Sequence, residues 1–305
     1  MMPHPCNDSA ASGCDARRSL EASTPRPVQP VTERAGWLSR DAFPLAARAT
    51  ASPTTVIIAA FFVIAALPSS ATAGSIKGRF VFGGDPPAAS ALTADKDVEV
   101  CGKHKLLAEE LVVGADKGIA NVVIYVRDKD VKITPEAAEA AKPGKALLDN
   151  KGCRFEPHVV FVQTGQELVV KNSDSVGHNS NIAALKNTPS NNLIPAGGEV
   201  TVKFTVEEAI PVGVTCNIHP WMKGWLLVRP NPYAAISNPD GSFEIKGLPA
   251  GDVELQFWHE KAGYLGEMKI GGKNEKPSRG RMKVKVPADG LDLGEITLAP
   301  GVFAK

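Results

Sequence analysis

The feature that most constrains the fold of this chain is a long succession of short segments rich in Val, Ile and Phe, each bounded by Gly, Pro, Asp or Asn. β-branched and aromatic residues favour strands, and the bounding residues favour turns. The clearest segments read SIKGRFVFGG, NVVIYVRD, HVVFVQTGQELVVKN, EVTVKFTVEE, GWLLVRP, GSFEIKG, DVELQFWHE and MKVKVPADG. Many short strands with this punctuation predict an all-β protein, either a sandwich or a barrel.

One helix interrupts the strand pattern. It is predicted within TPEAAEAAKPG, residues 134–144, with Thr134 as the N-cap and Pro135 at the first helical position. Pro143 and Gly144 are expected to end it. A domain boundary is expected near RPNPYAA, residues 229–235, where two prolines follow a strand.

The first 73 residues differ from the rest, because they are rich in Ala, Ser, Pro and Arg and contain no Lys. An apolar run, Val56–Leu67, has Arg48 upstream and Ala71-Thr72-Ala73 downstream, which is typical of a secretory signal with its cleavage site. About twelve apolar residues are too few to span a bilayer comfortably. We therefore expect a periplasmic, secreted or cell-surface protein with no stable membrane insertion after cleavage; an uncleaved anchor is the alternative.

Removal of residues 1–73 would leave 28 basic and 28 acidic residues, so nothing in the net charge indicates nucleic acid or an anionic membrane surface as a partner. Three cysteines would remain: Cys101, Cys153 and Cys216. In an oxidising compartment two of them can pair, and the third needs protection. A bound metal would provide it.

The stretch VTCNIHPWMKGW places Cys216, His219 and Met222 within a few residues of one another. A thiolate and a thioether select soft ions such as copper, and Met is a poor zinc ligand. Two histidines and a cysteine in a plane, with a weak axial Met, form a type 1 copper site. The second histidine is predicted to be His178, which lies in a polar turn after a strand ending at Lys171. The other histidines after residue 73 are interpreted as surface or hydrogen-bonded residues: His104, His158 and His259.

KNSDSVGHNSNI together with VTCNIHPWMKGWLLV resembles the cupredoxins, the small blue copper proteins, and Cys-x-x-His-Pro-Trp-Met looks most like the ligand loop of amicyanin. FEPHVVFVQTGQELVVKNSD is similar to the strand pair before the first ligand of plastocyanin-like domains. The segment from Tyr233 to Tyr264 resembles a carboxypeptidase regulatory-like domain, a transthyretin-like sandwich grouped with carbohydrate-binding-like folds. The combination is similar to bacterial sequences called methylamine utilisation proteins.

The resemblance implies a cupredoxin Greek-key β-sandwich followed by a small transthyretin- or Ig-like β-sandwich. The expected divisions are a presequence (1–73), a cupredoxin domain with an N-terminal extension (74–230) and a regulatory-like sandwich (231–305). In an alternative division, GSIKGRFVFGGDPP and GIANVVIYV are the opening strands of the second sandwich, and the copper domain is inserted into it.

The resemblance also implies the ligands of one copper ion: His178, Cys216, His219 and Met222. Asn179 would fasten the two ligand loops. His219 would present its ring edge at the surface, with Pro220 and Trp221 forming the electron-transfer patch around it; core packing of Trp221 is the alternative. With Cys216 held by metal, Cys101 and Cys153 are expected to form a disulfide.

These expectations describe an exported one-electron carrier that serves other redox proteins. Four protein donors leave no open coordination position, so we do not expect an enzyme. One alternative is a surface protein that binds polysaccharide or protein, with Trp258, His259 and Tyr264 as a stacking patch; Trp258 in a core is the opposing interpretation. Another alternative is copper storage or delivery.

Overall fold

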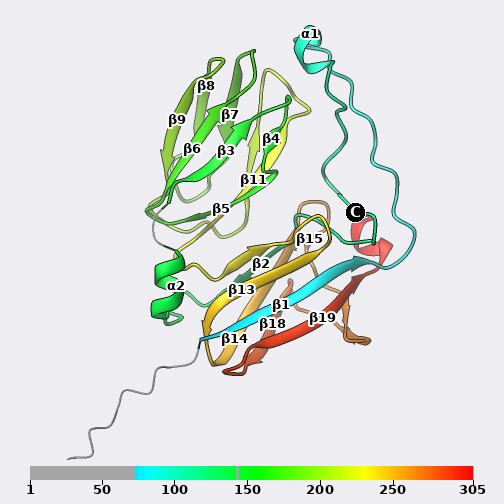
Figure 1. The fold of residues 1–305 in the computed structure, drawn as a ribbon, viewed down its shortest axis with the longest axis vertical. Helices are drawn as coiled ribbons and strands as arrows, with labels where there is room; N and C mark the ends of the chain where they lie inside the picture. The colour runs from blue at the N-terminus through cyan, green and yellow to red at the C-terminus, as the bar shows by residue number, and fades with distance from the viewer. Residues whose placement is uncertain (1–72, 142–143, 305) are drawn as a thin grey trace, which may run out of the picture. The chain divides into compact units, whose positions relative to one another are not determined.

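The structure is a computed structural model that describes residues 73–141 and 144–304 (Figure 1). The expected presequence, residues 1–73, lies outside the described residues except for its last residue. All described residues belong to one compact unit, Ala66–Lys305. In the described part of the chain, no helix combines the length and the apolar character that a membrane crossing requires.

The first sandwich is built from one continuous stretch of chain. Its two sheets have the strand orders β5-β11-β10-β7-β8 and β4-β3-β6-β9. The strands are β3 (Ala146–Asn150), β4 (Phe155–Glu156), β5 (Val159–Gln163), β6 (Glu167–Asn172), β7 (His178–Ile182), β8 (Ser190–Ile194), β9 (Glu199–Lys203), β10 (Val212–Thr215) and β11 (Lys223–Arg229). Their alternate apolar residues meet in a core that includes Leu148, Leu168, Val214 and Leu226.

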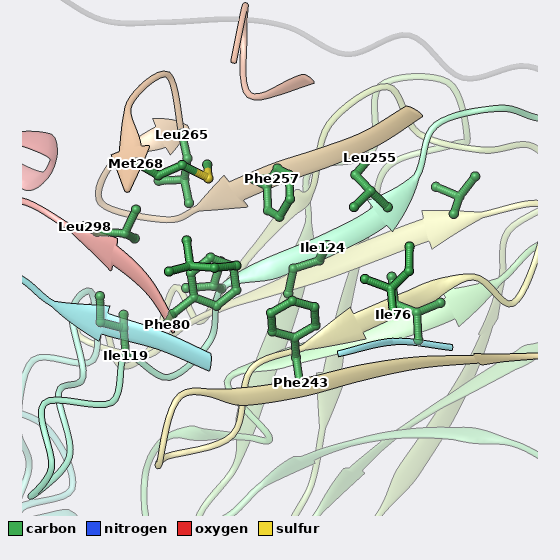
Figure 2. Close-up of a cluster of buried hydrophobic side chains, with 14 of the residues drawn as sticks. Ile76, Phe80, Ile119, Ile124, Phe243, Leu255, Phe257, Leu265, Met268 and Leu298 are labelled. Carbon is green, nitrogen blue, oxygen red and sulfur yellow. The ribbon is translucent and has the colours of Figure 1, made fainter. Parts of the chain in front are cut away.

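The second sandwich also has two sheets, in the orders β13-β1-β19-β16-β17 and β12-β2-β14-β15, with β18 paired to β14. The strands are β1 (Ala73–Phe82), β2 (Val123–Val126), β12 (Ala234–Ile236), β13 (Ser242–Pro249), β14 (Gly251–His259), β15 (Gly263–Tyr264), β16 (Met268–Ile270), β17 (Lys273–Glu275), β18 (Arg281–Val286) and β19 (Leu291–Leu298). Figure 2 shows part of its core, where Phe80, Phe243 and Phe257 pack together.

The strand pairings divide the chain differently from the expected boundary. β1 pairs antiparallel with β13 and parallel with β19, which lies beside it as the red strand next to cyan β1 in Figure 1. β2 pairs with both β12 and β14. Residues 73–126 therefore contribute β1 and β2 to the second sandwich, as in the alternative division. The reason is that the apolar side chains of these two strands pack in one core with those of strands that follow residue 230.

Three helical elements are present in the described residues: α1 (Val98–Cys101), α2 (Pro135–Ala140) and the 3₁₀ turn η1 (Pro300–Phe303). The predicted helix is confirmed as α2. The Thr134 hydroxyl accepts a hydrogen bond from the Ala137 amide at 3.2 Å, and Pro135 is in the first turn. The helix ends at Ala140, before Pro143 and Gly144.

The two sandwiches share a smaller apolar cluster. Val159, Trp225 and Leu227 come from the first sandwich, and Val123, Tyr125 and Trp258 come from the second. The rings of Trp225 and Trp258 meet edge to face, with their centroids 4.9 Å apart. This joint is separate from the cores within the two sandwiches.

Candidate metal centre

Strand pairing brings the predicted ligands together at one end of the first sandwich. β10 pairs antiparallel with β7, so that Thr215 lies opposite Asn181. Cys216 directly follows β10, and His178 opens β7. His219 and Met222 occupy the turn into β11, which is closed by hydrogen bonds from the Met222 amide to the His219 carbonyl (2.9 Å) and from the Cys216 amide to the Met222 carbonyl (3.3 Å).

Three donor atoms converge. The Cys216 Sγ lies 4.0 Å from His178 Nδ1 and 3.7 Å from His219 Nδ1, and the two imidazole centroids are 4.6 Å apart. The three ligand atoms lie within 4.8 Å of one another. Metal–nitrogen and metal–sulfur bonds of about 2.05 and 2.3 Å, set at a trigonal angle, place N and S about 3.8 Å apart. The donor set therefore fits a single ion held in a trigonal plane.

The surroundings of Cys216 favour the thiolate. Burial raises the pKa of this thiol, but hydrogen bonds from His178 and from the backbone amides of Asn179 and His219 outweigh it and lower the pKa to about 6. The thiolate is the form that binds metal. Cys216 is the free cysteine among those described, and its side chain is buried.

Asn179 links the two ligand loops. Its side-chain oxygen accepts hydrogen bonds from the amides of Asn217 (2.8 Å) and Ile218 (3.2 Å), and it lies 3.4 Å from Cys216 Sγ. Its amide nitrogen donates to Asn191 on β8 at 2.7 Å. The residue after the first histidine thus fixes the backbone that carries the cysteine and the second histidine.

Met222 is 1% exposed and belongs to the same buried cluster as Cys216 and Val214. Its thioether is a soft donor three residues after the His219 ligand, as Cys216 is three residues before it. The apolar cluster that contains Cys216 and Met222 is the core of the first sandwich.

A carboxylate holds the outer nitrogen of His178. Asp174 lies 3.0 Å from His178 Nε2 and accepts hydrogen bonds from the amides of Gly152 (2.7 Å) and Cys153 (2.9 Å). Burial lowers the pKa of His178, but Asp174 and the Cys216 sulfur outweigh it and raise the pKa to about 9. Burial raises the pKa of Asp174, but the bonds from His178 and the two amides hold it below its usual range. The pKa shifts of His178 and Cys216 have opposite directions, and each of these two side chains favours the charged form of the other.

A second carboxylate holds His219. Asp97, 122 residues earlier, places its Oδ2 2.8 Å from His219 Nε2. The expectation that His219 exposes its ring edge differs from the structure, in which this residue is 0% exposed. The reason is that Asp97 lies over the outer nitrogen, and the Trp221 ring lies beside it with centroids 5.1 Å apart.

The two residues assigned to the surface patch differ from each other. Pro220 is exposed, but Trp221 is only partly so. Trp221 packs in a small cluster with both bridged cysteines, and its indole N–H donates to the Cys153 carbonyl at 3.0 Å. The packing alternative therefore describes Trp221 better than a free surface position.

The predicted disulfide between Cys101 and Cys153 is present, with an S–S distance of 2.00 Å and both residues buried. Sequence reasoning missed Asp97 and Asp174. Asp174 had a signal, because it stands in the polar turn four residues before His178. Asp97 had none, because its contact depends on tertiary structure.

The remaining histidines lie outside the site. His104 is exposed, His158 pairs with Glu260, and His259 is 1% exposed. Trp258 is 7% exposed and packs at the joint between the sandwiches. Trp258 and His259 therefore offer no open stacking face of the kind that the polysaccharide alternative requires.

Comparison with known proteins gives partial likenesses only. No family model and no curated protein matches the chain. Among solved structures, a purple cupredoxin from Nitrosopumilus maritimus shares 21% identity over 28% of this chain and 99% of its own, with a TM-score of 0.24. A Cu(I) methionine-to-alanine mutant of amicyanin shares 17% over 35% of this chain and 98% of its own, with a TM-score of 0.26.

A copper-containing nitrite reductase from Thermus scotoductus shares 21% identity over 28% of this chain, with a TM-score of 0.26. The chain spans 23% of that enzyme's length. These scores and identities do not assign the chain to a family, and the interpretation of the site depends on its own donor atoms.

Proposed function

We propose that this protein binds one copper ion and carries single electrons between other redox proteins. The observation that carries the proposal is the convergence of His178 Nδ1, Cys216 Sγ and His219 Nδ1 within 4.8 Å of one another. A copper ion bound by this set supplies a one-electron Cu(II)/Cu(I) couple. Soft sulfur donors with imidazoles favour copper over zinc, and Met222 is available as the weak fourth donor.

The protein's own residues would keep the ligand geometry fixed while the charge of the ion changes. Asn179 ties the two loops together, and Asp174 and Asp97 hold the outer nitrogens of the two histidines. In each neutral ring, Nε2–H would donate a hydrogen bond to the carboxylate, which leaves the unprotonated Nδ1 free to bind metal. We assign no catalytic role, because four protein donors leave no open position for a substrate.

The disulfide Cys101–Cys153 supports the proposed export, because disulfides persist in oxidising compartments. Storage or rapid delivery of copper is less well supported. The four proposed ligands are each at most 1% exposed, so an acceptor has little access to the ion.

Titration of the purified metal-free protein with Cu(II) tests the proposal. An intense visible thiolate-to-copper band should grow to one equivalent and disappear on one-electron reduction. Cys216→Ser should remove the band, whereas the control His104→Asn, at an exposed histidine outside the site, should leave it unchanged. Uptake of one equivalent of Cu(II) by the wild type without such a band would refute the assignment.

A further inference from the structure

Asp97 makes a contact that its local structure does not explain. It stands at the N-cap of α1, where an Asp side chain ordinarily accepts a hydrogen bond from the first turn of the helix. Here the side chain makes no such bond, and the residue has left-handed backbone angles, φ 44° and ψ 45°. Its carboxylate instead lies 2.8 Å from His219 Nε2. The side chain of Asp97 therefore contacts a proposed ligand instead of capping α1, and its backbone has the left-handed conformation that Asp adopts more readily than most other non-glycine residues.

The disulfide anchors this arrangement. Cys101 ends α1, and its amide donates to the Asp97 carbonyl at 2.8 Å, so Asp97 lies one helical turn from the bridge. The partner, Cys153, belongs to the first sandwich between β3 and β4. The bridge therefore fastens the turn from Asp97 to Cys101, which we name the capping turn, to the sandwich that carries the proposed ligands.

Cys153, at the other end of the bridge, also contacts residues beside both proposed histidine ligands. The amide of Cys153 donates to Asp174, which holds His178, and the Cys153 carbonyl accepts from Trp221, whose ring lies beside His219. The carboxylates of Asp174 and Asp97 are therefore both connected to the Cys101–Cys153 bridge, Asp174 by a hydrogen bond and Asp97 through one turn of α1. Asp174 is fixed by backbone amides of the first sandwich itself, whereas Asp97 reaches the site only through the capping turn.

We propose that Asp97 is a positioning residue for His219, held in place by the Cys101–Cys153 disulfide. This inference depends on the proposed copper site. The carboxylate orients the imidazole and makes it a stronger donor, which stabilises Cu(II) relative to Cu(I). It also closes the outer edge of the ring, so a redox partner meets the capping turn and Pro220 rather than the His219 ring.

Asp97→Asn tests the proposal, because the amide keeps the size of the side chain and removes its charge. Glu99→Gln is the matched control: it removes the same charge two residues away, from an exposed side chain of the same helix. We expect Asp97→Asn to raise the reduction potential of the copper and to shift its visible band, and Glu99→Gln to change neither. Equal potentials and spectra in the wild type and both variants would overturn the proposal.

A double-mutant cycle tests the part played by the disulfide. Cys101→Ala/Cys153→Ala should shift the potential in the same direction as Asp97→Asn, and adding Asp97→Asn to it should have little further effect. Fully additive shifts would show that the bridge does not act through Asp97.

The metal-free protein provides a readout that needs no copper. Long-range ¹H–¹⁵N NMR should find His219 protonated at Nε2 in the wild type, with this signal altered in Asp97→Asn and unchanged in Glu99→Gln. A wild type that develops no copper band would instead count against the proposed function, so the two failures can be told apart.

Discussion

The two sandwiches are assembled from the chain in different ways. The first uses one continuous stretch, residues 146–229, whereas the second combines β1 and β2 with the strands that follow residue 230. The donor atoms all come from the continuous sandwich. The carboxylate that covers one of them, on Asp97, comes from the segment between two strands of the discontinuous one. The proposed ligands and the carboxylate that contacts His219 therefore come from different sandwiches and from different parts of the chain.

The strongest way to break this comparison is to unfold one sandwich without the other. Phe80→Ala removes a 0% exposed ring that stacks on Phe243, with centroids 5.1 Å apart, in the core of the second sandwich. The expected loss of unfolding free energy is about 3–5 kcal/mol. In thermal denaturation the circular dichroism change should precede loss of the copper band. Coincident transitions would mean that the two sandwiches unfold as one unit.

Leu226→Ala is the counterpart in the first sandwich, at a residue that is 0% exposed in the core below the site. The expected destabilisation is about 2–5 kcal/mol. Here the copper band should be lost at a lower temperature, together with the first change in circular dichroism. An unchanged midpoint for the band would contradict the placement of the ligands on this core.

A smaller effect concerns the ion pairs that join the two sandwiches. His158, between β4 and β5, pairs through Nε2 with Glu260, which follows β14, and its Nδ1 lies 3.7 Å from Glu109. Burial lowers the pKa of His158, but the two carboxylates outweigh it and raise the pKa to about 9. A raised pKa contributes stability below the unfolded value near 6.5, and that stability is lost as the pH rises through 9.

The shift corresponds to at most about 3.5 kcal/mol. The measurement is urea unfolding of the wild type and His158→Gln at several pH values. The difference between the two proteins should be largest near pH 6 and should shrink by pH 9.5. A difference that does not vary with pH would show that the pKa of His158 is the same in the folded and unfolded states.

Trp221→Phe sharpens the comparison at the disulfide. The change keeps an aromatic ring but removes the hydrogen bond to the Cys153 carbonyl, at a cost of about 1 kcal/mol. We expect a small loss of stability in urea and a modest shift of the copper band, because the ring also lies beside His219. A normal band with slower electron transfer to a redox partner would instead restore the surface-patch interpretation of Trp221.

A small effect on stability is also expected from Met222→Leu, a nearly volume-conserving change that costs less than about 1.5 kcal/mol. The trigonal donors remain, so the visible band should persist. Without the weak thioether donor, Cu(II) is stabilised less than in the wild type, so voltammetry should find a higher reduction potential. Complete loss of copper would show that Met222 is required for copper binding and is not only a weak fourth donor.

The parts that the sequence predicted correctly depend on local patterns. Strand-forming runs indicated an all-β chain, and Thr134 followed by Pro135 marked the start of α2. Cys216 and His219 share one turn, and His178 opens the strand beside it, so their convergence follows from a single strand pairing. The disulfide followed from having three cysteines and one proposed metal ligand.

The parts that sequence reasoning missed depend on long-range partners. The alternation in β1 indicates a strand but does not identify its neighbours, and these proved to be β13 and β19. Asp97 stands in a charged run, ADKDVEVCGKHK, which looks like any exposed loop. The burial of His219 could not be predicted for the same reason, because the residue that covers it is 122 positions away.

The parallel pairing of β1 with β19 also affects the order in which the strands can pair as the chain is synthesised. A ribosome completes β3 to β11 long before it reaches Leu298, so the first sandwich has all its strands while β1 still lacks a neighbour. β1 gains β13 next and β19 only at the end, and such late closure is slow because the contacts are distant in sequence. The strands of the first sandwich are therefore all available first, and β1 and β19 are the last strands to be joined.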